Sequence, residues 1–121
     1  MQLTKDILED VFRTARKVKT GQITLAQGGT ILVGAHRLNQ NSAAMMLRSL
    51  VHLHKGERYR RALTIGATDY FLTRIREEDG QAGLQTALRG LSAHIDYRES
   101  SGVRVPGLQS ILAKAERVAH L

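Results

Sequence analysis

Apolar residues recur at intervals of three and four along most of the chain, a spacing typical of helices that bury one side. The first series ends before Gly21, which follows a turn rich in Lys and Arg, as a helix C-terminus prefers. Its members are Ile7, Leu8, Val11, Ala15 and Val18. The segment that carries this series, up to Gly21, is therefore expected to form a helix.

A second helix is predicted from Thr24 to about Ala35. Thr24 and Gln27 have the residue types and spacing of a capping box. The glycines at 28 and 29 lie inside this helix, and we expect them either to let another helix approach closely or to break it.

A third helix is predicted after a polar turn over 36–40. Asn41 or Ser42 would cap its start, it would run to about His54, and Gly56 would stop it. Further helices are expected from Thr64 or Ile65 to near Gly80, over 82–97, and over 108–119, with a loop over 100–107. The alternation typical of strands never persists. The predicted fold is all-α, a compact bundle of five or six short helices forming a single domain over 1–121.

The third helix combines an apolar side with a polar stripe. Met45, Arg48, His52 and Lys55 form the stripe, opposite Ala43, Leu47 and Leu50. A short helix, a turn and a second helix can pack as a helix-turn-helix, whose second helix enters the DNA major groove. Because the predicted turn is long and lacks glycine, we expect a helix-turn-helix-like element.

Polar residues at the start of this helix are of the types that read DNA bases. Asn and Gln can pair with adenine edges and Arg with guanine, and Asn39, Gln40, Asn41 and Arg48 supply them. Asn41 could equally serve only as the helix cap.

The connector GERYRRAL follows the third helix directly. Arg58, Arg60 and Arg61 are suited to gripping phosphates, and Tyr59 adds an aromatic ring with a hydroxyl. The alternative is a cluster of surface charge with Tyr59 packed under the loop.

Charge is distributed unevenly along the chain, whose formal net charge is +7. Residues 36–61 contain six Lys or Arg and one acid, a net of +5, whereas 62–121 contain seven of each sign and are neutral. We expect the cations before residue 62 to gather into one patch beside the third helix. The commonest partner of such a patch is a polyanion, and double-stranded DNA is the expected one.

These observations define a predicted nucleic-acid-binding set on the turn, the third helix and the connector. Its members are Arg37, Asn39, Gln40, Asn41, Ser42, Met45, Arg48, His52, Lys55, Arg58, Tyr59, Arg60 and Arg61. The same face could instead dock an acidic protein, as a small adaptor or nuclease inhibitor would. RNA is less favoured, because only Tyr59 lies among the basic residues to stack on bases.

Five short motifs resemble a small helical domain that precedes HNH nuclease domains in modification-dependent bacterial restriction endonucleases. They lie at 38–43, 54–61, 67–75, 79–88 and 94–97, and the similarity covers about three quarters of the chain. The resemblance implies a DNA-recognition module in a restriction or phage-defence system, with a nuclease domain or subunit as a possible partner. The chain has no second His-rich ββα segment and no Cys pair, so the nuclease itself is missing.

Catalysis is not expected, nor is a cofactor or a metal. His52 and His54 would point to different faces of a helix, and His54 and His94 are expected to be hydrogen-bonded packing residues. The acidic run Glu77–Asp79 is expected to be a solvated turn. No apolar run is long enough for a membrane span, and without cysteine the chain fits the cytoplasm. A homodimer could use the neutral second half, around 70–75 and 84–95, unless these residues are core.

Overall fold

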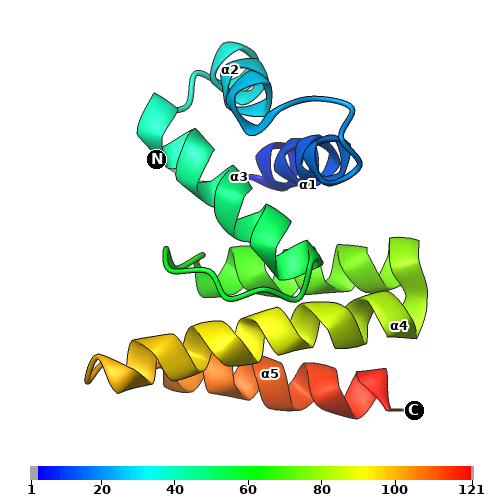
Figure 1. Cartoon of the computed structure of the whole chain (residues 1–121), viewed down its shortest axis with the longest axis vertical. Coiled ribbons are helices and arrows are strands. Elements are labelled where there is room, and N and C mark those ends of the chain that lie inside the picture. Colours follow the sequence, from blue (N-terminus) through cyan, green and yellow to red (C-terminus); the bar gives the residue numbers. More distant parts are fainter. Residues whose placement is uncertain (1–2, 121) are drawn as a thin grey trace.

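The computed structural model describes residues 3–120, within which the protein has five helices and no strand. The helices are α1 (Lys5–Lys19), α2 (Leu25–His36), α3 (Gln40–His54), α4 (Ile65–Ser100) and α5 (Pro106–Ala119) (Figure 1). The predicted all-α bundle is thus confirmed, and no helix of this part of the chain is both long and apolar enough to cross a membrane.

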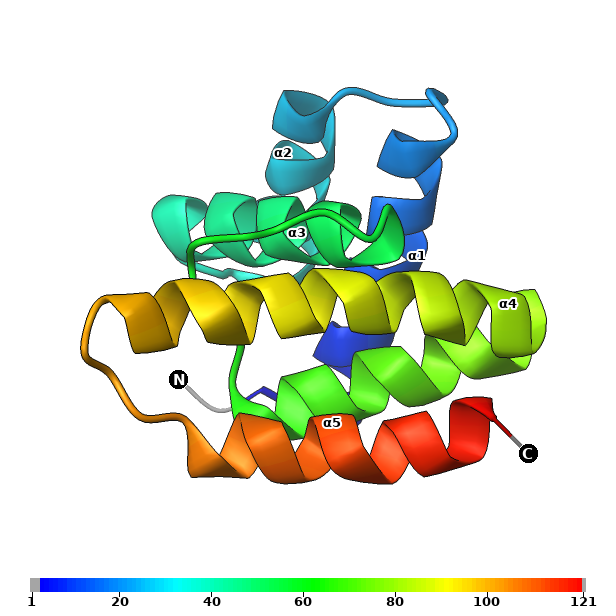
Figure 2. The same ribbon diagram turned by 60° about the horizontal axis from the view of Figure 1, so that its bottom comes forward.

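The long helix α4 is broken near its middle, where the sequence predicts the end of one helix and the start of the next. Gly80 has φ 70° and ψ −167°, a backbone conformation that residues other than glycine rarely adopt. The chain reverses there, and the two halves of α4 run back along each other (Figures 1 and 2).

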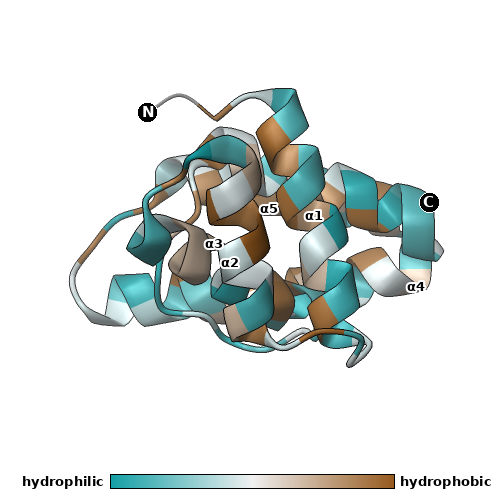
Figure 3. Cartoon of the chain, turned by 90° about the horizontal axis from the view of Figure 1, so that it is seen from above, coloured by the Kyte–Doolittle hydropathy of each residue, from teal (hydrophilic) through white to brown (hydrophobic). Residues whose placement is uncertain are grey.

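Helix α3 lies between two groups of helices. It packs against α1 and α2 on one side and against α4 on the other, while α5 covers the far side of α4 (Figures 1 and 2). Each helix carries both hydrophobic and hydrophilic positions, so each has a side to bury (Figure 3). Leu47, Leu50 and Leu53 of α3 and Phe12 of α1 are among the most buried side chains. The position of α3 at the centre of the core fixes it firmly, and leaves only one stripe of it at the surface.

Local sequence signals explain where the helices begin. Thr24 accepts a hydrogen bond from the Gln27 backbone N–H, and the Gln27 side chain accepts one from the Thr24 N–H, so the predicted capping box is present. Thr64 caps α4 in the same way through the Ala67 N–H. Pro106 starts α5, where its missing N–H costs nothing.

Gly28 lets α2 pack closely against neighbouring helices, which is the first of the two roles expected of Gly28 and Gly29. A Cβ at this position would lie 2.7 Å from Leu47 Cδ2 of α3 and 3.0 Å from Thr14 Cγ2 of α1. A methyl group there would crowd both neighbours. The absence of a side chain at Gly28 therefore allows α2 to pack closely against α1 and α3.

Most of the large apolar residues over 70–75 and 84–95 are core. Phe71, Ile75, Leu84 and Leu91 are buried between the halves of α4 and their neighbours. These residues therefore do not provide the dimer surface that the sequence left open.

Candidate nucleic-acid interface

The turn between α2 and α3 is shorter than predicted. It consists of Arg37, Leu38 and Asn39, and Arg37 has the left-handed conformation (φ 53°) that glycine commonly supplies at such a position. Its N–H donates to the Val33 carbonyl, and Leu38 is buried beside it. The prediction of a long turn was wrong, and a three-residue turn has the usual length for a helix-turn-helix.

Asn39, and not Asn41 or Ser42, caps α3. Its Oδ1 accepts hydrogen bonds from the backbone N–H groups of Asn41 at 2.9 Å and Ser42 at 3.2 Å. The predicted base-reading role of Asn39 therefore gives way to a structural one, because its acceptor oxygen is occupied. The side chain of Asn41, by contrast, is not needed for the cap and is exposed.

The predicted stripe on α3 lies at the surface. Gln40, Asn41, Ser42, Arg48 and Lys55 are exposed, and Met45 and His52 are half-buried. The opposite side of α3 is buried in the core. Helix α3 therefore offers side chains to a partner along one line only, starting at its N-terminus.

The stripe and the connector together form one groove. The connector, residues 55–64, runs back across α3 (Figure 2), and the cavity between them measures about 480 Å³. Its walls are Met45, Arg48, Ser49 and His52 of α3 and Arg58, Tyr59, Arg60 and Arg61 of the connector. We call this the basic groove. Neither an acidic residue nor a residue of α1 lines it.

Two hydrogen bonds fix the connector in place. Ser49 Oγ donates to the Arg61 carbonyl at 2.8 Å, and His94 Nδ1 donates to the Tyr59 carbonyl at 2.6 Å. The bond from His94 to a carbonyl requires that Nδ1 carries the proton, and burial lowers the pKa of this histidine. The prediction of a hydrogen-bonded packing residue is confirmed for His94.

Two glycines let the connector lie directly on α4. A Cβ at Gly56 would be 2.7 Å from the Thr86 carbonyl oxygen, and one at Gly90 would be 3.0 Å from the Glu57 carbonyl oxygen. Because these contacts are between backbone atoms, neither segment could move aside for an added side chain. The connector therefore packs directly against α4, in addition to its hydrogen bonds at Tyr59 and Arg61.

Tyr59 is a core residue, which corrects its predicted role in binding. Its side chain is 2 % exposed and stacks on the His94 ring with centroids 4.1 Å apart and planes 7° from parallel. Burial raises the pKa of its phenol well above the ordinary value. The alternative of a tyrosine packed under the loop is confirmed, and the arginines on either side of Tyr59 are left exposed.

The cations at the groove differ in their contacts. Arg58 lies over the Tyr97 ring at 5.2 Å, the Arg61 Nε–H points to the Met45 sulfur, and His52 Nδ1 is 3.1 Å from Glu57 Oε1. Within residues 3–120, Arg48 and Arg60 have no carboxylate at ion-pairing distance, and the same holds for Arg37 and Lys55 at the two ends of the stripe. Apart from Glu57, which pairs with His52, no carboxylate of the described residues pairs with a side chain that lines the groove, so the groove is basic.

The cations of α1 do not join this patch, contrary to the expectation that all cations before residue 62 gather. Arg13 pairs with Glu9 at 2.9 Å, and Arg16 pairs with Asp79 at 2.9 Å beside the break in α4. The acidic run lies inside α4 and not in a turn; Glu77 and Glu78 are exposed, as expected, and both accept hydrogen bonds from Arg74.

His54 is buried, but the hydrogen bonds expected for it are absent. Both ring nitrogens lack a partner among the described residues, and the ring lies 5.4 Å from that of Phe12. Burial, with Lys19 and Arg16 nearby, lowers the pKa of His54 to about 4. Over 3–120, no group of three or more acids and histidines could hold a metal ion.

Sequence reasoning missed Ser49 and Gly90, which position the connector. It gave packing under the loop as the alternative for Tyr59 and expected His94 to be a hydrogen-bonded packing residue, but it did not predict that the two rings stack. Of the two glycines beneath the connector, only Gly56 gave a sequence signal, as a helix stop. No protein-family model, curated protein or solved structure matches the chain. The resemblance to the domain that precedes HNH nucleases thus stays a prediction.

Proposed function

We propose that the protein is a DNA-binding module that holds duplex DNA with the basic groove and the exposed start of α3. The observation that carries this proposal is the convergence, in one groove, of Arg48 and His52 from α3 with Arg58, Arg60 and Arg61 from the connector. Cations that have no carboxylate partner in the protein are available to the phosphates of a partner.

The two sides of the groove would make different contacts with DNA, the connector with phosphates and α3 with bases. The connector arginines are held on a rigid backbone, which suits phosphate contacts that fix register without reading sequence. Gln40 and Asn41 are exposed in the first turn of α3, the end that reads base edges in a helix-turn-helix, and Arg48 is exposed just past the middle of the helix. A three-residue turn, with α1 packed against both helices, supports this comparison.

The test is a titration of labelled duplex DNA at two salt concentrations. We expect Arg60→Ala to weaken binding to all sequences alike and to reduce the slope of log K against log salt by about 0.9, the value for one phosphate contact. Arg76→Ala is the matched control: it removes the same charge from an exposed site between α4 and α5, away from the groove. This variant should bind as the wild type does.

Arg48→Ala and Asn41→Ala test the reading role. Each should relax the preference for one base position by about 1–3 kcal/mol. Asn41→Ala should leave the salt slope unchanged, whereas Arg48→Ala, which also removes a charge from the groove, should lower it. The proposal fails if the wild type binds no duplex more tightly than about 10⁻⁴ M at low salt. It also fails if Arg76→Ala weakens binding as much as Arg60→Ala.

The biological setting follows from the resemblance alone. A recognition module of this kind would serve a bacterial or phage restriction or defence system in the cytoplasm, paired with a separate nuclease domain or subunit, and would not itself be an enzyme. The alternative, an adaptor or inhibitor that docks an acidic protein, predicts a partner that still co-purifies from a host lysate after nuclease treatment. A DNA-binding module should lose such partners.

A further inference from the structure

A second cavity adjoins the basic groove at the start of α3. It measures about 400 Å³, within the range of about 300–1,000 Å³ that small-molecule pockets occupy. Met45 and Arg61 line both cavities, so the two lie side by side with these two side chains between them. We call this second cavity the methionine pocket.

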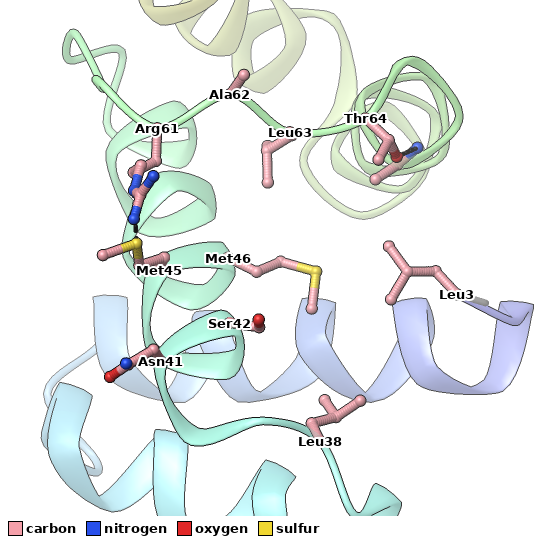
Figure 4. A pocket seen from close by; sticks show the side chains of 11 residues that line it. Leu3, Leu38, Asn41, Ser42, Met45, Met46, Arg61, Ala62, Leu63 and Thr64 are labelled. Carbon is pink, nitrogen blue, oxygen red and sulfur yellow. Dashed lines mark hydrogen bonds between the residues drawn. The ribbon is translucent and has the colours of Figure 1, made fainter. Parts of the chain in front are cut away.

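The methionine pocket is apolar inside. Leu38, Leu63 and Ala67 are buried at its floor. Figure 4 shows Met46 extending from α3 toward Leu3, between Leu63 on one side and Ser42 on the other. No charged residue lines it except Arg61, which sits at the border with the groove and points its guanidinium to the Met45 sulfur.

From this juxtaposition we infer that the methionine pocket receives an unpaired nucleobase of the nucleic acid whose phosphates lie in the basic groove. The inference rests on the proposed function and names the feature of the DNA that the site would prefer.

Three features of the cavity fit a base. Thioethers make favourable contacts with aromatic rings, and the flexible Met46 side chain can move aside for a flat group. The Ser42 hydroxyl and the Arg61 guanidinium, at the mouth, can hydrogen-bond to the polar edge of a ring. The adjoining cations would hold the phosphates of the same nucleotide or its neighbours, which brings the base to the mouth.

Such a base must be unpaired before it can enter. A base inside a duplex is stacked and paired, and extruding it costs a few kcal/mol. A bulged base has no pairing to lose. The pocket would thus favour DNA that carries a bulge over the fully paired duplex.

The experiment compares a short DNA duplex with the same duplex carrying one unpaired thymine. We expect the wild type to bind the bulged duplex about tenfold more tightly, and Ser42→Leu, which narrows the pocket, to bind the two duplexes with equal affinity, so the readout is the ratio of the two affinities and not either one alone. Ser42→Ala is the control for volume: it leaves the space open and removes only the hydroxyl, so it should retain most of the preference.

A cross-link on the wild-type protein provides a readout that depends on no variant. With 5-iodouracil in place of the unpaired thymine, irradiation should attach the DNA to the tryptic fragment 38–48, which holds Ser42, Met45 and Met46. Attachment to a fragment other than 38–48 or 62–74, which holds Leu63 and Ala67 of the pocket, would overturn the inference and leave the proposed function standing. Equal binding of the two duplexes by the wild type, or a preference that survives in Ser42→Leu, would do the same. Failure to bind either duplex would remove both.

Discussion

The arginines of this protein include one group that forms ion pairs within residues 3–120 and another that does not. On the α1 side, Arg13, Arg16 and Arg74 each meet a carboxylate at 2.7–3.0 Å. At the basic groove, Arg48 and Arg60 have no carboxylate partner among the described residues. In the first group, Arg16 and Arg74 join α1 to α4 and Arg13 pairs within α1, whereas the second group is left for something outside the chain. Net charge alone therefore says little about which cations a partner can use.

The difference originates in where the acids lie. Glu9 is one helical turn from Arg13 and also accepts from Arg74 and from the Tyr70 hydroxyl, so a single carboxylate joins α1 to α4. Around the groove the connector contains one acid, Glu57, and this is engaged with His52.

The largest expected effect comes from removing the anchor beneath the connector. Tyr59→Ala deletes a buried ring and should lower the free energy of unfolding by about 3–5 kcal/mol. Because the connector then loses its support, DNA binding should weaken although no charge is removed. Denaturant unfolding and a binding titration measure the two effects.

Tyr59→Phe is the control for the anchor. Its ring can still stack on His94, and the lost hydroxyl has no hydrogen-bond partner among the described residues, so stability should stay the same or rise. If Tyr59→Phe folds normally and yet loses DNA binding, the hydroxyl itself contacts nucleic acid, and the assignment of Tyr59 to the core alone is wrong.

The next largest effect is the loss of folding stability at acid pH on the α1 side, where protonation of the buried His54 is unfavourable. His54 has a pKa of about 4 when folded against an ordinary value of 6.5, because it is buried with Lys19 and Arg16 nearby, although Asp79 opposes them. The unfolded chain binds the proton first, so stability is complete above pH 6.5 and falls as the pH drops toward 4. The loss should total about 3 kcal/mol.

Urea unfolding at a series of pH values measures this loss. In His54→Leu the dependence between pH 6.5 and 4 should largely vanish, since no group remains at that site to protonate. An unchanged pH profile in His54→Leu would assign the dependence to another group.

Much of the fold could be predicted because its signals are local. Thr24 and Gln27 lie within one turn of each other, and the glycine at 80 breaks a helix by its own conformation. The start of α3 was misplaced because Asn39, Asn41 and Ser42 are all good caps, and the choice depends on the left-handed backbone of Arg37.

The site was predictable only in its charged part. The connector arginines can be read directly from the sequence, but the burial of Tyr59 depends on His94, 35 residues further along the chain. In the same way, Arg16 and Asp79 are 63 residues apart, and Arg74 and Glu9 are 65 apart. Sequence shows how many charges there are, whereas tertiary packing decides which of them are neutralised.

The smallest expected effects separate the arginines of the α1 side from one another. Arg74→Met should cost about 1–2 kcal/mol, because Arg74 bonds Glu9, Glu77 and Glu78 together and lies over the Phe12 ring at 4.9 Å. Arg13→Met, the matched control, loses only an exposed pair one turn apart and should cost about 0.3–0.5 kcal/mol.

The pH profile identifies the cause of the larger loss. Arg74 holds the pKa of Glu9 at about 2, below its ordinary 4.5, so the stability from this contact is present above pH 4.5 and disappears as the pH falls toward 2. Arg74→Met should remove most of this dependence, and Arg13→Met little of it. Both variants should bind DNA within about twofold of the wild type, because neither arginine lines the groove. A binding loss in Arg13→Met as large as in Arg60→Ala would mean that overall charge, and not the groove, attracts the DNA.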